Sequence, residues 1–218
     1  MKLPFTTEQF FKVIEAYNVT IFPAQWIILV LGVFCLFLLH SSYPARNRII
    51  GTYLGALWIW SGIVYHLIFF TGINKAAYVF GGIFILQGLL ILFNTYHNNR
   101  LNFTFEQKTR AYVGYFFVLY GLVIYPIVSY FVEGSFERTI MIGLPCPTTI
   151  VTFGLFILTS KVFPKYLLII PTLWAIAGLS AAINIGVVQD VMIMISALTA
   201  LLLLAGRKTV TVSVSSKS

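Results

Sequence analysis

The sequence predicts an all-α, polytopic membrane protein, and three observations support this fold class. Hydrophobic residues make up 59% of the 218 residues and charged residues only 9%, whereas a soluble domain carries about 25% charged residues to cover its surface. The apolar residues gather in seven runs, each near the ~20 residues that a helix needs to cross the hydrocarbon core of a bilayer. The basic residues fall mainly in the connections between these runs. We therefore expect a seven-transmembrane-helix bundle.

A short amphipathic helix is predicted before the first span, at residues 6–18. Thr6 is followed three residues later by Gln9, the spacing of a capping box at a helix N-terminus. One face of this helix is apolar and carries Phe10, Phe11, Ile14 and Tyr17. Such a helix suits the membrane interface; the alternative is a simple polar leader. Glu8 and Glu15 interrupt any continuous apolar core, so the segment does not resemble a cleavable signal peptide.

The seven apolar runs form one predicted domain, residues 1–208. The proline, glycine and polar residues between them place the spans at about 22–40, 48–70, 76–96, 111–132, 146–161, 166–185 and 190–206. The connection 97–110 contains an alternating apolar patch, which predicts a small ribbon or a segment lying on the membrane. Residues 209–218 are rich in serine, valine and threonine, and we expect them to form a disordered tail.

The lysines and arginines predict the orientation of the bundle. Because consecutive connections lie on opposite sides of the bilayer, the basic residues divide between two sides. One side carries Lys2, Lys12, Lys75 and Arg138. The other side carries Arg46, Arg48, Arg100, Lys108, Arg110, Lys161, Lys165, Arg207, Lys208 and Lys217. The positive-inside rule assigns the richer side to the cytoplasm, so we expect the N-terminus outside and the C-terminus in the cytoplasm.

In this topology, polar side chains collect in the outer half of the bundle. The candidate site residues are Glu15 and Asn18 before the first span, His66 in the second, Tyr125 in the fourth, Cys146, Thr148 and Thr149 in the fifth, Asn184 in the sixth, and Asp190 in the seventh. A polar group inside a membrane span is costly unless it is paired, and it often marks a site that faces the bundle interior. The sequence therefore predicts a polar pocket that opens to the extracytoplasmic side.

The motif Gly143-Leu144-Pro145-Cys146-Pro147-Thr148-Thr149 is the most specific of these features. Proline is tolerated in the first turn of a helix, so the motif predicts a helix N-terminus that carries a thiol and two hydroxyls. A helix N-terminus favours the reactive thiolate and attracts anionic or polar groups. The alternative is a proline-capped turn in which the cysteine merely packs.

His66 and Asp190 each allow two interpretations. His66 is either a proton carrier or ligand, or a histidine that is hydrogen-bonded to a neighbouring helix or reaches the interface. Asp190 either exchanges a proton or only complements a helix dipole at its N-terminus.

Several classes of protein are disfavoured by what the sequence lacks. One histidine beside one cysteine does not make a zinc site, which needs three or four ligands, and the seventh span has no lysine that could carry retinal. No cofactor is indicated. Cys35 and Cys146 fall at opposite depths of their helices, so a disulfide between them is not expected. The net charge of +8 resides in short loops and does not indicate nucleic-acid binding. The bilayer is the expected partner, together with a small molecule or ion.

Four stretches of the sequence resemble an uncharacterised family of small bacterial multi-pass membrane proteins, a domain of unknown function. These stretches are Glu8–Phe11 with Ile14–Asn18, Tyr65-His66 with Phe69-Phe70, Gly143–Thr149, and Pro171–Trp174. The resemblance covers nearly the whole chain, apart from residues 97–110 and the tail. It implies a multi-pass protein of the plasma (inner) membrane and brings no reaction or ligand.

Three functional hypotheses follow. The first is a transporter or ligand-binding membrane protein for a small solute or ion, with its site in the outer pocket. The second is a thiol-dependent membrane enzyme or redox protein that uses Cys146. The third is an accessory subunit of a membrane complex. The sequence indicates no catalytic residue, and an enzyme is the less favoured interpretation.

Overall fold

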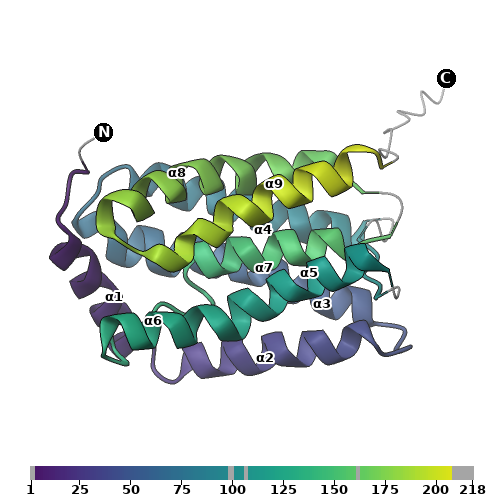
Figure 1. The fold of residues 1–218 in the computed structure, drawn as a ribbon, viewed down its shortest axis with the longest axis horizontal. Coiled ribbons are helices and arrows are strands. Elements are labelled where there is room, and N and C mark those ends of the chain that lie inside the picture. The colour runs from purple at the N-terminus through teal and green to yellow at the C-terminus, as the bar shows by residue number, and fades with distance from the viewer. Residues whose placement is uncertain (1–2, 98–100, 106–107, 161–162, 208–218) are drawn as a thin grey trace.

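The computed structural model describes residues 3–97, 101–105, 108–160 and 163–207 as an elongated bundle of helices (Figure 1). The α-helices are α1 (Thr7–Ile21), α2 (Ala24–Leu39), α3 (Arg46–Trp60), α4 (Ala77–Tyr96), α5 (Thr109–Leu119), α6 (Tyr125–Glu133), α7 (Pro145–Ile157), α8 (Ile169–Ile185) and α9 (Val191–Ala205). The described residues contain only two isolated β-bridges besides these helices and their 3₁₀ and π-helical extensions. The all-α prediction is therefore confirmed for the described chain.

Two of the long helices contain π-helical segments. The π-helical segment η1 (Ser61–Phe69) continues α3, and η3 (Tyr120–Ile124) joins α5 to α6. The single turns η2 (Phe70–Gly72), η4 (Lys165–Leu168) and η5 (Val188–Asp190) lengthen the ends of other helices. π-Helical turns are rare and frequently occur at functional sites, and η1 contributes Tyr65 to the lining of the cavity described below.

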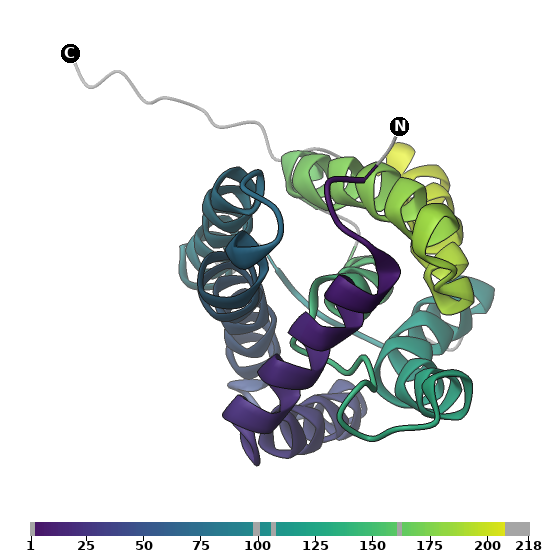
Figure 2. The same ribbon diagram turned by 90° about the vertical axis from the view of Figure 1, so that its left-hand side faces the viewer.

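Helix α1 lies across one end of the bundle and is bent by 83° from α2 (Figures 1 and 2). The predicted capping box is confirmed, because Thr6 Oγ1 accepts a hydrogen bond from the Gln9 amide and Gln9 Oε1 accepts one from the Thr6 amide. The apolar face of α1 does not lie free for lipid. Three of its residues, Phe11, Ile14 and Tyr17, are buried against the bundle. We call this end of the molecule the α1 end.

Five of the described helices are long and apolar enough to cross a membrane, or six if the bent pair α1 and α2 is counted as one span. The second, third, fourth and sixth predicted spans and most of the seventh coincide with these five helices. The helices run over Arg46–Gly72, Ala77–Tyr96, Thr109–Glu133, Lys165–Ile185 and Val188–Ala205. The first predicted span corresponds to α2, which has 16 residues. The predicted tail, residues 209–218, lies outside the described residues.

The fifth predicted span, 146–161, is wrong in its extent. Helix α7 ends at Ile157 and has 13 residues, about 20 Å at ~1.5 Å per residue, which is shorter than a hydrocarbon core of about 30 Å. It is the central helix of the bundle, surrounded by the others in the end-on view (Figure 2). All of its residues except Cys146 are buried. Its short length is compatible with this position because neighbouring protein, rather than lipid or water, covers its ends.

The N-terminal end of α7 is held by hydrogen bonds from inside the bundle. Gly143 lies two residues before the helix and has a positive φ of 99°, a backbone conformation that favours glycine. Ser61 Oγ donates a hydrogen bond of 2.6 Å to the Gly143 carbonyl, and the Gly143 amide donates to Thr148 Oγ1 at 3.3 Å. One turn along, Trp58 Nε1 donates to Thr152 Oγ1 at 2.8 Å and connects α3 to α7.

The C-terminal end of α7 is capped by two arginines from other helices. Arg207, just beyond α9, donates to the Ile157 carbonyl at 3.1 Å and to Thr159 Oγ1 and the Ser160 carbonyl at 2.6 Å each. Arg110 donates to the Thr159 carbonyl at 3.0 Å. Carbonyl groups at a helix C-terminus have no partner within the helix, and positive charge is favourable there. The two arginines therefore satisfy a helix end that water does not reach.

The connection 97–110 pairs with the segment that follows α7. Phe103 and Thr159 form an isolated antiparallel bridge, with hydrogen bonds of 2.8 Å from the Thr104 amide to the Leu158 carbonyl and from the Ser160 amide to the Asn102 carbonyl. The predicted ribbon is thus formed between two connections rather than within one. Residues 98–100 and 106–107 lie outside the described part.

Glycines allow helices to approach each other closely at two crossings. In the antiparallel pair α3–η1 and α4, a Cβ on Gly88 would lie 2.6 Å from the Gly55 carbonyl oxygen, and one on Gly62 would lie 2.8 Å from that of Gly81. At the crossing of α5 and α7, a Cβ on Gly154 would lie 2.7 Å from the Gly114 carbonyl oxygen. Such stripes of small residues are typical of helix pairs packed within a membrane.

We predict that Gly88→Ala destabilises the protein. The new methyl group would overlap the Gly55 carbonyl, and overpacking of this kind costs about 1–3 kcal/mol in the free energy of unfolding. The midpoint of thermal unfolding in detergent measures the effect. Gly82→Ala, in the same helix, is the matched control, because its Cβ would meet no atom within 4 Å and alanine favours helix by about 0.5–1 kcal/mol. Equal midpoints for the two variants would contradict the close packing.

Candidate functional site

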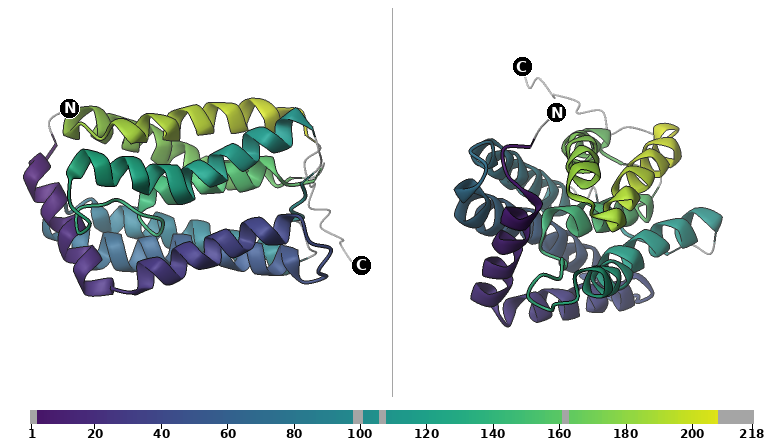
Figure 3. Two further views of the ribbon diagram at one scale, coloured as in Figure 1. Left: turned by 60° about the horizontal axis from the view of Figure 1, so that its bottom comes forward. Right: turned by 60° about the vertical axis from the view of Figure 1, so that its left-hand side comes forward.

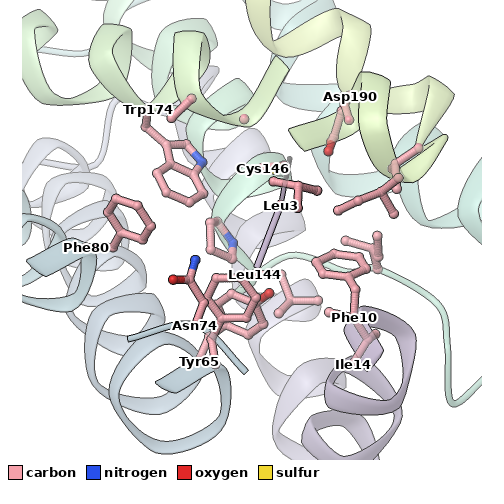
Figure 4. A pocket seen from close by; sticks show the side chains of 18 of the residues that line it. Leu3, Phe10, Ile14, Tyr65, Asn74, Phe80, Leu144, Cys146, Trp174 and Asp190 are labelled. Atoms are coloured by element: carbon pink, nitrogen blue, oxygen red, sulfur yellow. The ribbon is translucent and has the colours of Figure 1, made fainter. Parts of the chain in front are cut away.

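A cavity of about 150 Å³ lies at the α1 end, between α1, the η1 and η2 segments, the start of α7, and the outer parts of α8 and α9 (Figure 4). Its walls are mostly apolar and include six aromatic rings besides Tyr125: Phe5, Phe10, Tyr65, Phe70, Phe80 and Trp174. The polar pocket expected from the sequence is therefore largely an apolar cavity, with a few polar side chains at defined points.

Asp190, Tyr125 and Cys146, three of the predicted site residues, converge on this cavity, whereas His66 is not in its lining. Tyr125 Oη donates a short hydrogen bond to Asp190 Oδ1. Asp190 is only 6% exposed and is the N-cap residue of α9, yet its side chain makes no capping hydrogen bond. Its carboxyl group is turned toward the cavity (Figure 4), so the structure does not use Asp190 as a side-chain cap for α9.

Cys146 is the one partly exposed residue of α7, and its thiol lies between Asp190 and Trp174. The indole nitrogen of Trp174 is turned toward this thiol (Figure 4). Within the described chain, the buried Trp174 Nε1 forms no well-aligned hydrogen bond, and it interacts with the Cys146 thiol. Because sulfur is a weak acceptor, a stronger acceptor on a molecule in the cavity would compete for this N–H. Cys35 lies elsewhere in the core, and both thiols are free.

The start of α7 offers little to an anion, contrary to the sequence expectation. Anion binding at a helix N-terminus uses the free N–H groups of the first turn. Pro145 and Pro147 have no N–H, and the Thr148 amide already donates to the Leu144 carbonyl at 3.2 Å. Only the Cys146 amide remains among the first three residues of the helix.

Thr148 and Thr149 lie behind the cavity wall rather than in it. Both are fully buried and neither lines the cavity. Thr149 Oγ1 donates to the Pro145 carbonyl at 2.8 Å, and Thr148 Oγ1 accepts from the Gly143 amide. Their hydroxyls therefore stabilise the first turn of α7 and are not directed at a ligand.

His66 is fully buried in a cluster of aromatic rings. Its ring centroid lies 4.7 Å from that of Phe84, 5.2 Å from Trp174 and 5.9 Å from Phe80. Neither ring nitrogen has a hydrogen-bond partner among the described residues, so the expected bond to a neighbouring helix is not formed. His66 does not line the cavity but packs against the aromatic side chains that do.

Three candidates lie away from the cavity. Asn184 is exposed, and its amide donates to the Ser180 carbonyl one turn earlier in α8. Asn18 is buried and donates to the carbonyls of Glu137 and Thr139 at 2.7 and 2.8 Å. It therefore attaches α1 to the 134–144 segment. Glu15 forms an ion pair with Arg138, as described next.

Helix α1 and the residues before it close the cavity. Leu3, Phe10 and Ile14 belong to its lining and lie over the side chains of the bundle in Figure 4. Arg138 holds α1 in place, with contacts of 2.8 Å to Glu8 and 3.4 Å to Glu15. The Arg138 guanidinium lowers the pKa of the Glu8 carboxyl group, so the pair persists to a pH below the ordinary value for a glutamate and is lost in stronger acid.

Sequence reasoning missed several residues of the site, above all Trp174, Tyr65, Phe80 and the N-terminal Leu3. Trp174 occurs in one of the stretches that carry the family resemblance, which was the only signal for it. In a helix that is apolar on all sides, the sequence does not reveal which residues face the interior. The described residues contain no group of three or more potential metal ligands.

The fold and the cavity together define a class: a bundle of apolar helices that could span a membrane, with a small, partly open cavity at one end. Residues 7–215 match the model of the family described as a family of unknown function, DUF6064. The chain belongs to this family. No curated protein and no solved structure matches the sequence.

We predict that Arg138→Gln increases access to Cys146. Because exposed ion pairs contribute about 0.2–1 kcal/mol each, the loss of both pairs should raise the rate of Cys146 alkylation by N-ethylmaleimide by about two- to thirtyfold. The measurement is a mass-spectrometric time course in a Cys35→Ala background, where Cys146 is the remaining cysteine. Lys75→Gln, which removes an exposed cation from the same end, should leave the rate unchanged. Equal rates for both variants would exclude a role of α1 in closing the cavity.

Proposed function

We propose that this protein is a multi-pass membrane protein that binds a small, mainly apolar molecule in the cavity under α1. One observation carries the proposal: a mainly apolar, partly open cavity at which a carboxyl group, a thiol and an indole N–H converge. Small-molecule sites typically combine apolar walls with a few such polar groups, which fix the orientation of the ligand.

The volume of the cavity limits the size of the ligand. At about 150 Å³, it resembles engineered protein cavities that stay dry and bind benzene, and it is smaller than the ~300–1,000 Å³ of most drug-sized sites. A single aromatic ring or a branched alkyl group with one polar substituent suits these dimensions. Lipid acyl chains and larger solutes are too large for this volume.

Binding is better supported than transport. A transported solute would have to pass α7, but the cavity reaches no residue of α7 beyond Cys146, and Pro147 to Ile157 are all buried. We therefore propose that the ligand enters and leaves on the α1 side. A ligand that binds under α1 and alters its position would make the protein a sensor or a carrier of that ligand.

A thiol-dependent enzyme is less well supported. Nucleophilic cysteines depend on a neighbouring base or cation that favours the thiolate. The charged group beside Cys146 is the carboxyl group of Asp190, and His66 is separated from the cavity by aromatic rings. Cys146 is accordingly assigned to binding rather than to catalysis.

We further propose that the α1 end faces outward and that the protein resides in the plasma membrane with its C-terminus in the cytoplasm. The distribution of charge supports this orientation. At the α1 end, the described basic residues are Lys12, Lys75 and Arg138. The opposite end carries Arg46, Arg48, Lys108, Arg110, Lys165 and Arg207, which agrees with the positive-inside rule.

We predict that benzyl alcohol stabilises the purified protein and that Gly178→Leu abolishes this effect. A Cβ at position 178 would lie 3.5 Å from Ile193 and 3.8 Å from Cys146, so the leucine side chain extends into the cavity without an initial clash. At ten times its dissociation constant, a ligand adds about 1.4 kcal/mol, a shift of roughly 3–6 °C in the unfolding midpoint for a protein of this size.

Gly82→Leu is the matched control for that experiment. It adds the same side chain at a position with no neighbouring atom within 4 Å, so it corrects for the effect of benzyl alcohol on the detergent. The variant should keep the shift of the wild-type protein. A shift that persists in Gly178→Leu would locate binding elsewhere and would overturn the proposed site.

We predict that cysteine labelling in intact cells reveals this orientation. The single-cysteine variants are made in a protein that lacks the two native cysteines. A membrane-impermeant maleimide should label Lys75→Cys from outside, whereas Arg48→Cys should react only after the cells are opened. Both positions are exposed, so accessibility within the protein does not limit either reaction. The reverse pattern would invert the topology and place the cavity on the cytoplasmic side.

A further inference from the structure

We propose that the ligand of the cavity is a small organic cation: a protonated amine attached to an apolar or aromatic group. This inference rests on the proposed binding function and names the chemistry of the ligand. The charge, the aromatic rings and the hydrogen-bond donors of the cavity wall support this inference.

Asp190 is the only charged side chain among the described residues that line the cavity. The Tyr125 hydroxyl donates to its Oδ1, and the Cys146 thiol lies beside the carboxyl group. None of the described lysines and arginines lines the cavity with it. A buried carboxylate is stabilised when it is paired with an opposite charge as well as hydrogen-bonded. The wall supplies the hydrogen bond, and a cationic ligand would supply the charge.

The aromatic rings around the cavity add a second preference for a cation. Tyr65, Phe80 and Trp174 approach it from the bundle, and Phe10 approaches it from α1 (Figure 4). The face of an aromatic ring attracts an ammonium group, and the attraction increases when both are shielded from water. Rings on several sides and one carboxylate are the combination by which proteins recognise organic ammonium ions. The same rings would pack against the apolar part of the ligand.

The wall is correspondingly poor in groups that stabilise an anion. Pro145 and Pro147 remove two N–H groups from the first turn of α7, so the helix N-terminus is a weak anion site. The Trp174 N–H interacts only with the weakly accepting Cys146 thiol within the described chain, but a single donor does not offset the repulsion between an anionic ligand and the Asp190 carboxylate. A neutral ligand would occupy the volume and leave Asp190 without a counter-charge.

The experiment compares three probes of similar size and different charge: benzylamine, benzyl alcohol and benzoate. Each is titrated at neutral pH into the full-length protein in detergent, and the shift of the unfolding midpoint against probe concentration yields an apparent dissociation constant. Gly178→Leu serves as the blank for each probe. We expect benzylamine to bind at least tenfold more tightly than benzyl alcohol, and benzoate to give no shift above the blank.

Asp190→Asn tests the counter-charge, because it preserves the shape of the side chain and removes its charge. The variant should lose the preference for benzylamine, which should then bind within about twofold of benzyl alcohol, while the affinity for benzyl alcohol changes little. Glu133→Gln removes an acid from the same end that does not line the cavity, and should retain the preference. If Asp190→Asn does not fold, the selectivity of the wild-type protein for the amine decides the question.

The outcomes separate this inference from the proposed function. Equal binding of benzylamine and benzyl alcohol to the wild-type protein, or tighter binding of benzoate, would overturn the cation while leaving the binding site intact. A preference for benzylamine that survives in Asp190→Asn would also overturn it. If no probe stabilises the wild-type protein more than Gly178→Leu, the proposed binding function fails as well.

Discussion

The structure depends on satisfying both ends of a short helix that lies inside the protein. Helix α7 is surrounded by other helices, and all of its residues except Cys146 are buried. Backbone groups at such ends need partners from elsewhere. At the C-terminal end, Arg207 and Arg110 supply them. At the N-terminal end, two prolines remove donors, and hydrogen bonds from Ser61 and to Thr148 hold the preceding turn. The positions of α3, α5 and α9 follow from these contacts.

The cavity is a consequence of where α7 begins. Helix α7 starts farther from α1 than the connection between α8 and α9 does (Figure 3), and the cavity lies between the first residues of α7 and α1. Cys146 is the residue of α7 that borders this space. The motif around it therefore has two physical roles: its prolines and threonines form a stable buried helix start, and its cysteine forms the floor of the cavity.

Helix α1 covers the cavity at the α1 end of the molecule. Its apolar face packs on the bundle, Asn18 fastens it to the 134–144 segment, and Arg138 adds exposed ion pairs. Exposed pairs contribute little to stability, which would suit the proposed passage of a ligand under α1. The buried hydrogen bonds of Asn18 are the more permanent attachment, so the part of α1 nearest Glu8 is the part best able to open.

Much of the fold could be predicted from the sequence by itself, because composition, apolar run length and the capping box are local properties. They determined the all-α class, the approximate bounds of the long helices and the start of α1. Which side chains share a cavity was decided only by the tertiary structure, because helices that are apolar all round carry no periodic signal of their inward face. Cys146, Tyr125 and Asp190 converge, whereas Thr148, Thr149 and Asn184 turn away. The short length of α7 was likewise decided by the tertiary structure, in which residues distant in the sequence cap its ends. An apolar run does not show by itself whether lipid or protein will surround it.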